Sequence, residues 1–182
     1  WFFGGSTMWG TGSSDKGTIP SIYNQLTNKN VKNLGESGWV SRQSLNQLLN
    51  LLGDGYKPSE VVFYSGHNDI GGGCRTEIDI LPSHGRSLKI SRLIKGESNF
   101  LGYLSYINFK LLEPYRVIIR KTNLHELFKK TSYNHSFYNC HNNNNKAESV
   151  ARHLVNNWHA AYLLSRLNNA RFYAVLQPNI YS

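Results

Sequence analysis

Short apolar runs alternate with amphipathic stretches along this chain, and that alternation limits the folds open to it. The runs suited to buried strands are residues 1–3, 31–34, 60–64 and 172–176. Between them lie stretches whose apolar residues recur at helical spacing, most clearly from Ser41 and over residues 146–168. Apolar strands separated by amphipathic helices are typical of a parallel sheet covered on both faces. We therefore expect an α/β fold in three layers.

Local signals mark the ends of two helices. Thr18 or a neighbour is placed to cap a helix whose first turn holds Pro20. The helix that starts at Ser41 carries a single leucine stripe, and Gly53 and Gly55 mark its end.

The remaining stretches have weaker patterns. Residues 70–99 show no sustained period, and we expect an irregular excursion there. Residues 100–112 have weak helical spacing, residues 115–130 suit either a strand or a helix, and residues 131–145 read as a polar loop.

Length and charge exclude some classes of protein. A chain of 182 residues with 40% hydrophobic content suits one domain. Because it starts within the first expected strand and stops soon after the last, we expect residues 1–182 to be a single domain truncated at both ends. No run approaches the ~20 apolar residues of a membrane-spanning helix. The net charge is +9, but Lys and Arg are scattered along the chain and no nucleic-acid motif accompanies them. We therefore interpret this charge as a solvated basic surface.

The two cysteines, Cys74 and Cys140, lack the Cys-x-x-Cys spacing of zinc sites and redox motifs. We expect two unpaired thiols. The alternative is a disulfide, which suits an exported protein. The sequence leaves the cellular location and the oligomeric state open.

Three glycine-containing motifs follow the expected strands in order. Residues 4–7 read Gly-Gly-Ser-Thr, residues 33–38 read Asn-Leu-Gly-Glu-Ser-Gly, and residues 66–69 read Gly-His-Asn-Asp. In a parallel sheet, the carboxyl ends of the strands lie at one edge, within reach of a single ligand.

Together the three motifs resemble those of the SGNH hydrolases, also called GDSL-type esterases and lipases. The first departs from the family pattern, with Gly-Ser-Thr in place of Asp-Ser-Leu. The resemblance covers nearly the whole chain, and it implies a flavodoxin-like α/β/α sandwich. It implies hydrolysis of carboxylic esters, including O-acyl groups on carbohydrate or lipid, through an acyl-enzyme on Ser6. It also implies an oxyanion hole formed by the backbone N–H groups of Ser6 and Gly35 and the side-chain amide of Asn68. No metal or cofactor is required.

The family's general base is missing from these residues. It should be the histidine of an Asp-x-x-His block near the C-terminus, and no such block occurs here. We expect it to lie in a segment beyond Ser182, and we assign its role to none of the seven histidines. His67 is placed to contact substrate, whereas His153 and His159 fit the surface or core of the long helix.

Three other functions stay open at this point. An acyltransferase shares the first half-reaction, with a sugar hydroxyl in place of water. A non-catalytic module could bind acylated sugars or lipids in the same cleft. A flavodoxin-like nucleotide binder is the weakest alternative, because neither Gly-x-Gly-x-x-Gly nor Gly-Lys-Ser/Thr occurs. Residues 70–99 and 131–145 are the expected specificity loops.

Overall fold

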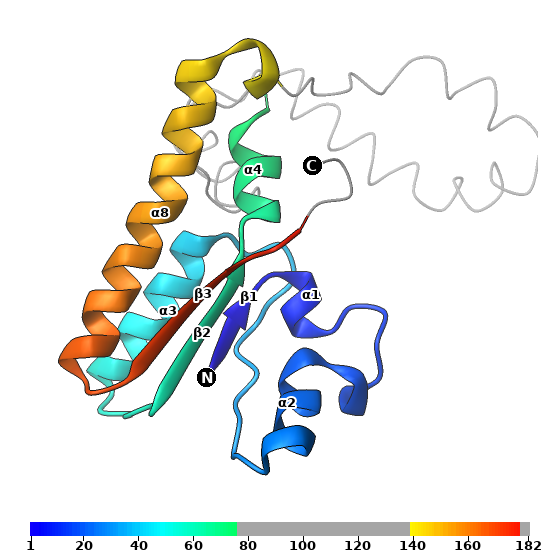
Figure 1. Ribbon diagram of the computed structural model, residues 1–182, viewed down its shortest axis with the longest axis vertical. Coiled ribbons are helices and arrows are strands. Elements are labelled where there is room, and N and C mark those ends of the chain that lie inside the picture. Colours follow the sequence, from blue (N-terminus) through cyan, green and yellow to red (C-terminus); the bar gives the residue numbers. More distant parts are fainter. Residues whose placement is uncertain (76–138, 179–182) are drawn as a thin grey trace, which may run out of the picture. The chain divides into compact units, whose positions relative to one another are not determined.

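The computed structural model describes residues 1–75 and 139–178 (Figure 1). The chain divides into two units, Trp1–His84 with Phe137–Ser182, and Gly85–Ser136. Every element given below belongs to the first unit. The predictions for residues 76–138, including those for 100–112 and 115–130, lie outside the described residues.

The described residues form a mixed α/β structure around a three-stranded parallel sheet, as expected. The strands are β1 (Phe2–Gly4), β2 (Glu60–Ser65) and β3 (Arg171–Leu176), in the order β1-β2-β3. The expected strand at 31–34 forms only a bridge, in which Asn33 pairs with Phe2. Parallel-type hydrogen bonds flank this bridge: Phe2 N–H donates to the Lys32 carbonyl (3.0 Å), Leu34 N–H to the Phe2 carbonyl (2.7 Å) and Glu36 N–H to the Gly4 carbonyl (3.1 Å).

Five α-helices accompany the sheet within the described residues. They are α1 (Ser6–Trp9), α2 (Ile19–Thr27), α3 (Ser41–Gly53), α4 (His67–Gly73) and α8 (Asn144–Leu167), with short 3-10 helices at Asp15–Gly17 and Cys140–Asn142. Thr18 caps α2 as predicted, since its hydroxyl accepts from Ser21 N–H (3.3 Å). The prediction of an irregular segment from residue 70 was wrong for residues 70–73, which complete α4.

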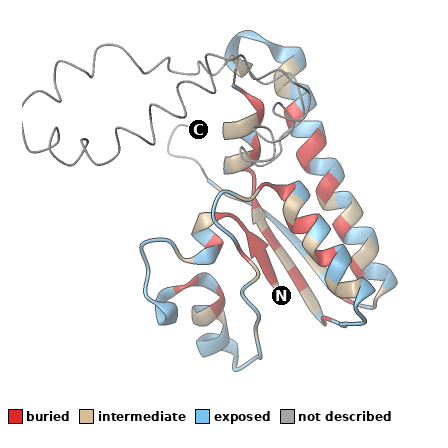
Figure 2. Ribbon diagram, turned by 180° about the vertical axis from the view of Figure 1, so that it is seen from behind, coloured by how far each residue is buried: buried red, intermediate tan, exposed pale blue. Residues whose placement is uncertain are grey.

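The core lies between the sheet and the pair α3 and α8, which pack against each other (Figures 1 and 2). Along β2, the fully buried Val61 and Phe63 alternate with the half-buried Glu60, Val62 and Tyr64. Phe63 lies at the centre, with its ring centroid 5.1 Å from that of Phe3 and 5.4 Å from that of Phe172. Leu45 and Leu48 of α3 and Ala161 of α8 complete this cluster.

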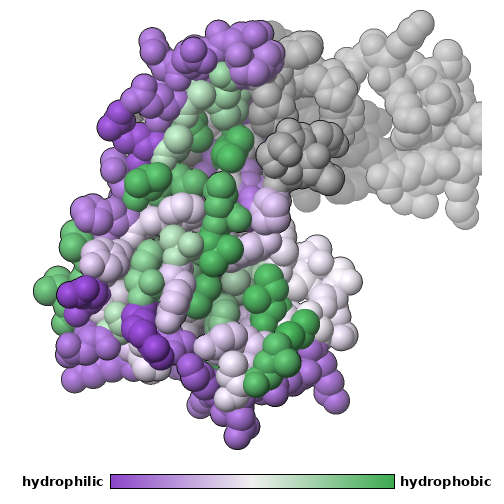
Figure 3. All heavy atoms as spheres, viewed as in Figure 1, coloured by the Kyte–Doolittle hydropathy of each residue, from purple (hydrophilic) through white to green (hydrophobic). Residues whose placement is uncertain are grey.

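The prediction of a buried strand at 172–176 was right about the strand and wrong about its burial. Tyr173, Val175 and Leu176 are 42–58% exposed, and apolar surface extends over the sheet face seen in Figure 3. In the part of the chain that the structure describes, β3 is an edge strand paired only with β2. Tyr173 and Val175 alternate with Phe172, which packs against the core, so their side chains lie on the other face of the sheet and are exposed there.

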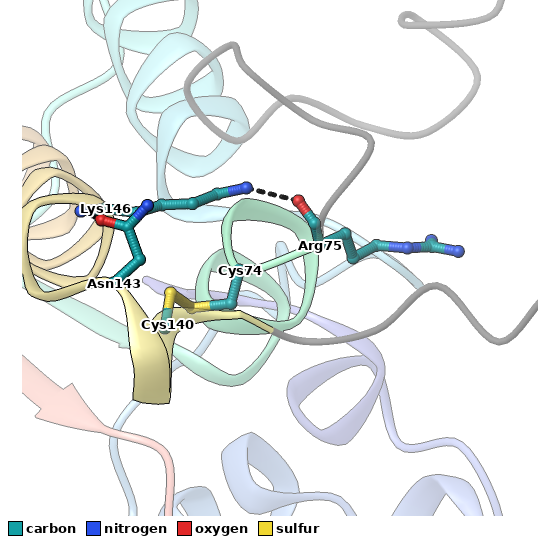
Figure 4. Close-up of a disulfide and its surroundings, with 5 residues drawn as sticks. All are labelled: Cys74, Arg75, Cys140, Asn143 and Lys146. Carbon is teal, nitrogen blue, oxygen red and sulfur yellow. Dashed lines mark hydrogen bonds between the residues drawn. A yellow bond between two sulfur atoms is a disulfide. The ribbon is translucent and has the colours of Figure 1, made fainter.

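Cys74 and Cys140 form a disulfide, with a Cα–Cα distance of 5.2 Å, so the prediction of unpaired thiols was wrong. The bond joins the end of α4 to the 3-10 helix before α8 (Figure 4). Beside it, Lys146 Nζ donates to the Arg75 carbonyl, and Asn143 caps α8 by accepting from Lys146 N–H (3.0 Å). The spacing of the two cysteines gave no signal for a contact between residues 66 positions apart.

Candidate functional site

The turn between β1 and α1 is built from two glycines that leave no room for a side chain. A Cβ atom added at Gly4 would lie 2.4 Å from the Tyr64 carbonyl oxygen, and one added at Gly5 would lie 2.4 Å from Asn68 Nδ2. Gly5 has a φ of −86°, so close contact rather than unusual backbone geometry requires glycine here. The turn therefore brings the backbone before Ser6 directly against Asn68.

Ser6 is the first residue of α1 and is half-buried. The first intrahelical bond runs from Trp9 N–H to the Gly5 carbonyl (3.0 Å), so the Ser6 N–H precedes the hydrogen-bonded turn. Within residues 1–75 and 139–178, neither this N–H nor the Ser6 hydroxyl has a hydrogen-bond partner. Both groups are thus available to a ligand at this edge of the sheet.

Asn68 lies in the first turn of α4, directly after β2. Its Nδ2 donates to the Trp39 carbonyl at 2.8 Å. An amide nitrogen carries two hydrogens, so one N–H remains for a ligand beside Gly5. Trp39 fixes the orientation of this amide, and sequence reasoning missed that contact because Trp39 lies in no motif.

Gly35 packs against the C-terminal half of α1, where an added Cβ would lie 2.7 Å from the Trp9 nitrogen. Its N–H donates to Asn33 Oδ1 (3.1 Å), and Asn33 Nδ2 donates to the Met8 carbonyl (3.0 Å). Asn33 therefore ties the Gly35 turn to α1. The Gly35 N–H has an acceptor in this arrangement, which a substrate oxygen would have to share or replace.

The end of β3 also lies at this edge of the sheet. Gln177, directly after β3, donates from Nε2 to Thr7 Oγ1 at 2.8 Å. The rule that ligand-binding residues follow the strands of a parallel sheet points to Gln177, although it belongs to none of the three motifs.

A buried polar cluster supports the Asn68 turn from behind. Asp69 is fully buried and accepts from the Ser41 N–H (3.0 and 3.1 Å) and the Ser41 hydroxyl (2.5 Å). Asn157 Nδ2 of α8 donates to the same hydroxyl at 2.8 Å. Burial raises the pKa of Asp69, and the hydrogen bonds from Ser41 oppose that rise. The cluster links α3, α4 and α8, which gives Asp69 a structural role.

None of the histidines within the described residues is hydrogen-bonded to the Ser6 hydroxyl. His67, at the start of α4, is exposed, as are His141 and His159. His153 is buried, and its Nε2 has no hydrogen-bond partner within the described residues. Burial first, and then Arg42, lower the pKa of His153, whereas Asp69 acts to raise it. His84, His125 and His135 lie outside the described residues.

No family model matches this sequence, and no curated protein matches it either. Among the described residues, no helix combines the length and apolar character needed to cross a membrane.

Proposed function

We propose that this chain forms the core of a serine ester hydrolase of the SGNH type, with Ser6 as nucleophile. The observation that carries the proposal is the contact between the Gly5–Ser6 turn and the Asn68 amide at the carboxyl ends of β1 and β2. A hydroxyl and two unengaged N–H donors then lie close together, which is what acyl transfer requires.

The strand order supports the same proposal. The Asn33 segment lies on the free side of β1, so the order is Asn33 segment, β1, β2, β3. If the four segments are numbered in chain order, with the Asn33 segment as the second, their order across the sheet is 2-1-3-4. Flavodoxin-like sheets have this order, and their ligands bind outside the carboxyl ends of the strands where the order reverses. Ser6 and Asn68 follow the two strands at that position. A three-layer sandwich is the finer form of the fold that we propose on this basis.

In the proposed reaction, the Ser6 oxygen attacks the ester carbonyl and the carbonyl oxygen becomes negatively charged. The Ser6 N–H and the free N–H of Asn68 donate to that oxygen. The bond to the alcohol then breaks, the alcohol leaves with a proton, and water hydrolyses the acyl-enzyme to release the acid. The Ser6 proton must pass to a base, and we assign none within the described residues.

The decisive experiment is covalent labelling with a fluorophosphonate probe, followed by mass mapping of the adduct. It uses the 182-residue chain and a version that carries the residues encoded after Ser182. We expect the adduct on Ser6, lost in Ser6→Ala and retained in Ser14→Ala, a matched change in an exposed loop.

Labelling of the longer chain alone would place the base beyond Ser182, whereas labelling of both would place it within residues 1–182. Absence of an adduct from both chains would overturn the hydrolase proposal and favour a non-catalytic binding module. If Ser6 is labelled, comparing water with sugar acceptors as the second substrate separates a hydrolase from an acyltransferase.

A further inference from the structure

The end of β3 is joined to α1 by a side-chain hydrogen bond between residues 170 positions apart. Gln177, which directly follows β3, donates from Nε2 to Thr7 Oγ1 at 2.8 Å. Because β2 lies between β1 and β3, this bond crosses the end of β2 to reach the helix that follows β1. The end of β3 approaches α1 in Figure 1. Gln177 therefore contacts the element that presents Ser6.

The backbone of Gln177 is held by the sheet. Its N–H donates to the Ser65 carbonyl (2.9 Å), which extends the pairing of β3 with β2 by one residue. The preceding Leu176 lies against the turn between β2 and α4, since a Cβ added at Gly66 would lie 2.6 Å from Leu176 Cδ1. That turn carries Asn68. The end of β3 thus contacts the β2–α4 turn through Leu176 and α1 through Gln177.

α1 depends on contacts outside itself, because it spans only four residues and so short a helix is not stable alone. Its second half is well anchored. Met8 is buried, and Asn33 Nδ2 donates to the carbonyls of Met8 (3.0 Å) and Trp9 (3.3 Å). Its first half consists of Ser6 and Thr7. Within residues 1–75 and 139–178, the bond from Gln177 is the one side-chain hydrogen bond that this half makes.

The placement of Ser6 matters for acyl transfer. Its oxygen must meet the ester carbonyl carbon while the Asn68 amide meets the carbonyl oxygen. A displacement of about 1 Å can slow such a step about 10²-fold. Ser6 and Asn68 lie on different elements, α1 and α4, so their relative position depends on what joins these elements. Because Thr7 is the neighbour of Ser6, a shift of Thr7 moves the nucleophile.

We propose that Gln177 is a positioning residue for Ser6. Through Thr7 it holds the first half of α1 beside the β2–α4 turn, so that the nucleophile and the Asn68 amide keep their relative positions. Gln177 acts through Thr7 and takes no part in making or breaking bonds. This role rests on the proposed function of Ser6.

The test is the kinetics of fluorophosphonate labelling of Ser6, in the chain version that is labelled. Thr7→Val and Gln177→Met each remove the hydrogen bond and nearly keep the size of the side chain. We expect each to lower the maximal labelling rate about 10–100-fold and to change the half-saturating probe concentration less than about twofold, because positioning affects the chemical step. The double variant should match the single variants, since both lose the same bond. Thr7→Ser keeps the hydroxyl and should label at the original rate.

The matched control is Gln25→Met. Gln25 Nε2 donates to the Lys16 carbonyl (3.1 Å) at an exposed position on α2, so the same change breaks a glutamine hydrogen bond away from Ser6. It should label at the original rate, with circular dichroism checking the fold of every variant.

Two results would overturn the role of Gln177 and leave the proposed function standing. One is an unchanged labelling rate in Thr7→Val or Gln177→Met. The other is a double variant whose loss is the product of the two single losses, because the two residues would then act separately. Failure of the unchanged chain to label at Ser6 is a different result, which would overturn the proposed function and this role with it.

Discussion

The contact between Gly5 and the Asn68 amide is so close that one methyl group would disturb it. We expect Gly5→Ala to displace the amide, because the new Cβ would lie 2.4 Å from Nδ2. Asn68→Ala removes the donor, and loss of one such donor slows acyl transfer about 10²–10³-fold. Both variants should therefore slow fluorophosphonate labelling of Ser6. Gly53→Ala, at a position with open space, is the control and should label at the original rate.

Two buried serines on α3 differ in their partners and should differ in their effect on stability. The Ser41 hydroxyl bonds to Asp69 and Asn157, so Ser41→Ala should lower the free energy of unfolding by about 1–3 kcal/mol. The Ser44 hydroxyl has no partner within the described residues, so Ser44→Ala should leave that free energy unchanged or raise it. Urea unfolding of the two variants measures the difference, and equal losses would contradict it.

The buried His153 should make stability depend on pH. Because its pKa is lowered in the folded protein, the unfolded chain binds its proton more readily. The stability that the neutral side chain contributes is present above its ordinary pKa of about 6.5 and falls as the pH drops below that value. We expect urea unfolding at pH 5.5 and 7.5 to show a smaller difference in His153→Gln than in the original chain. The exposed His159→Gln should behave like the original, and an unchanged difference in His153→Gln would contradict the assignment.

The sequence predicts the site only as far as strand ends and short motifs reach. The positions of Ser6 and Asn68 after two strands could be predicted because glycines mark the ends of β1 and β2. The hydrogen bond from Gly35 N–H to the Asn33 side chain could not be predicted, because it depends on one side-chain rotamer. The carbonyl of Trp39 that orients Asn68 could not be predicted either, since any residue supplies a backbone carbonyl.

At the scale of elements, periodicity located most helices and strands, since each buries one face in the same core. The 24-residue α8 was expected over 146–168 and forms over Asn144–Leu167. The helical structure of residues 70–73 was not predicted, because three of these residues are glycines, which have low intrinsic helix propensity. In the structure these glycines form the end of α4, which Asp69 anchors. The exposure of β3 was also missed, because an apolar run does not show whether both faces of its strand are covered.

The disulfide should stabilise the pairing of α4 with α8. In the chain-entropy model, closing a loop between residues 66 positions apart contributes about 4 kcal/mol. We expect Cys74→Ala with Cys140→Ala to lower the free energy of unfolding by roughly 2–4 kcal/mol. Urea unfolding with and without a reducing agent checks this. The reductant should destabilise the original chain and leave the double variant unchanged.

At the scale of the whole unit, one aromatic side chain joins the three strands to both core helices. Phe63 is fully buried between Phe3 and Phe172, so Phe63→Ala should cost about 3–5 kcal/mol. Leu26→Ala, at a position 81% exposed, should change stability by less than about 0.5 kcal/mol. Hydrogen exchange should show protection falling together in β1, β2, β3 and α8 in the Phe63 variant. A loss confined to β2 would contradict a shared core.

The Cys74–Cys140 bond also closes part of the backbone into a covalent ring. A protease that cuts once anywhere between these two residues opens the ring without releasing a fragment. The N-terminal piece, with Ser6 and Asn68, then stays attached to the C-terminal piece that carries α8 and β3. Such a nicked chain would run as one band on a denaturing gel until a reductant separates it into two.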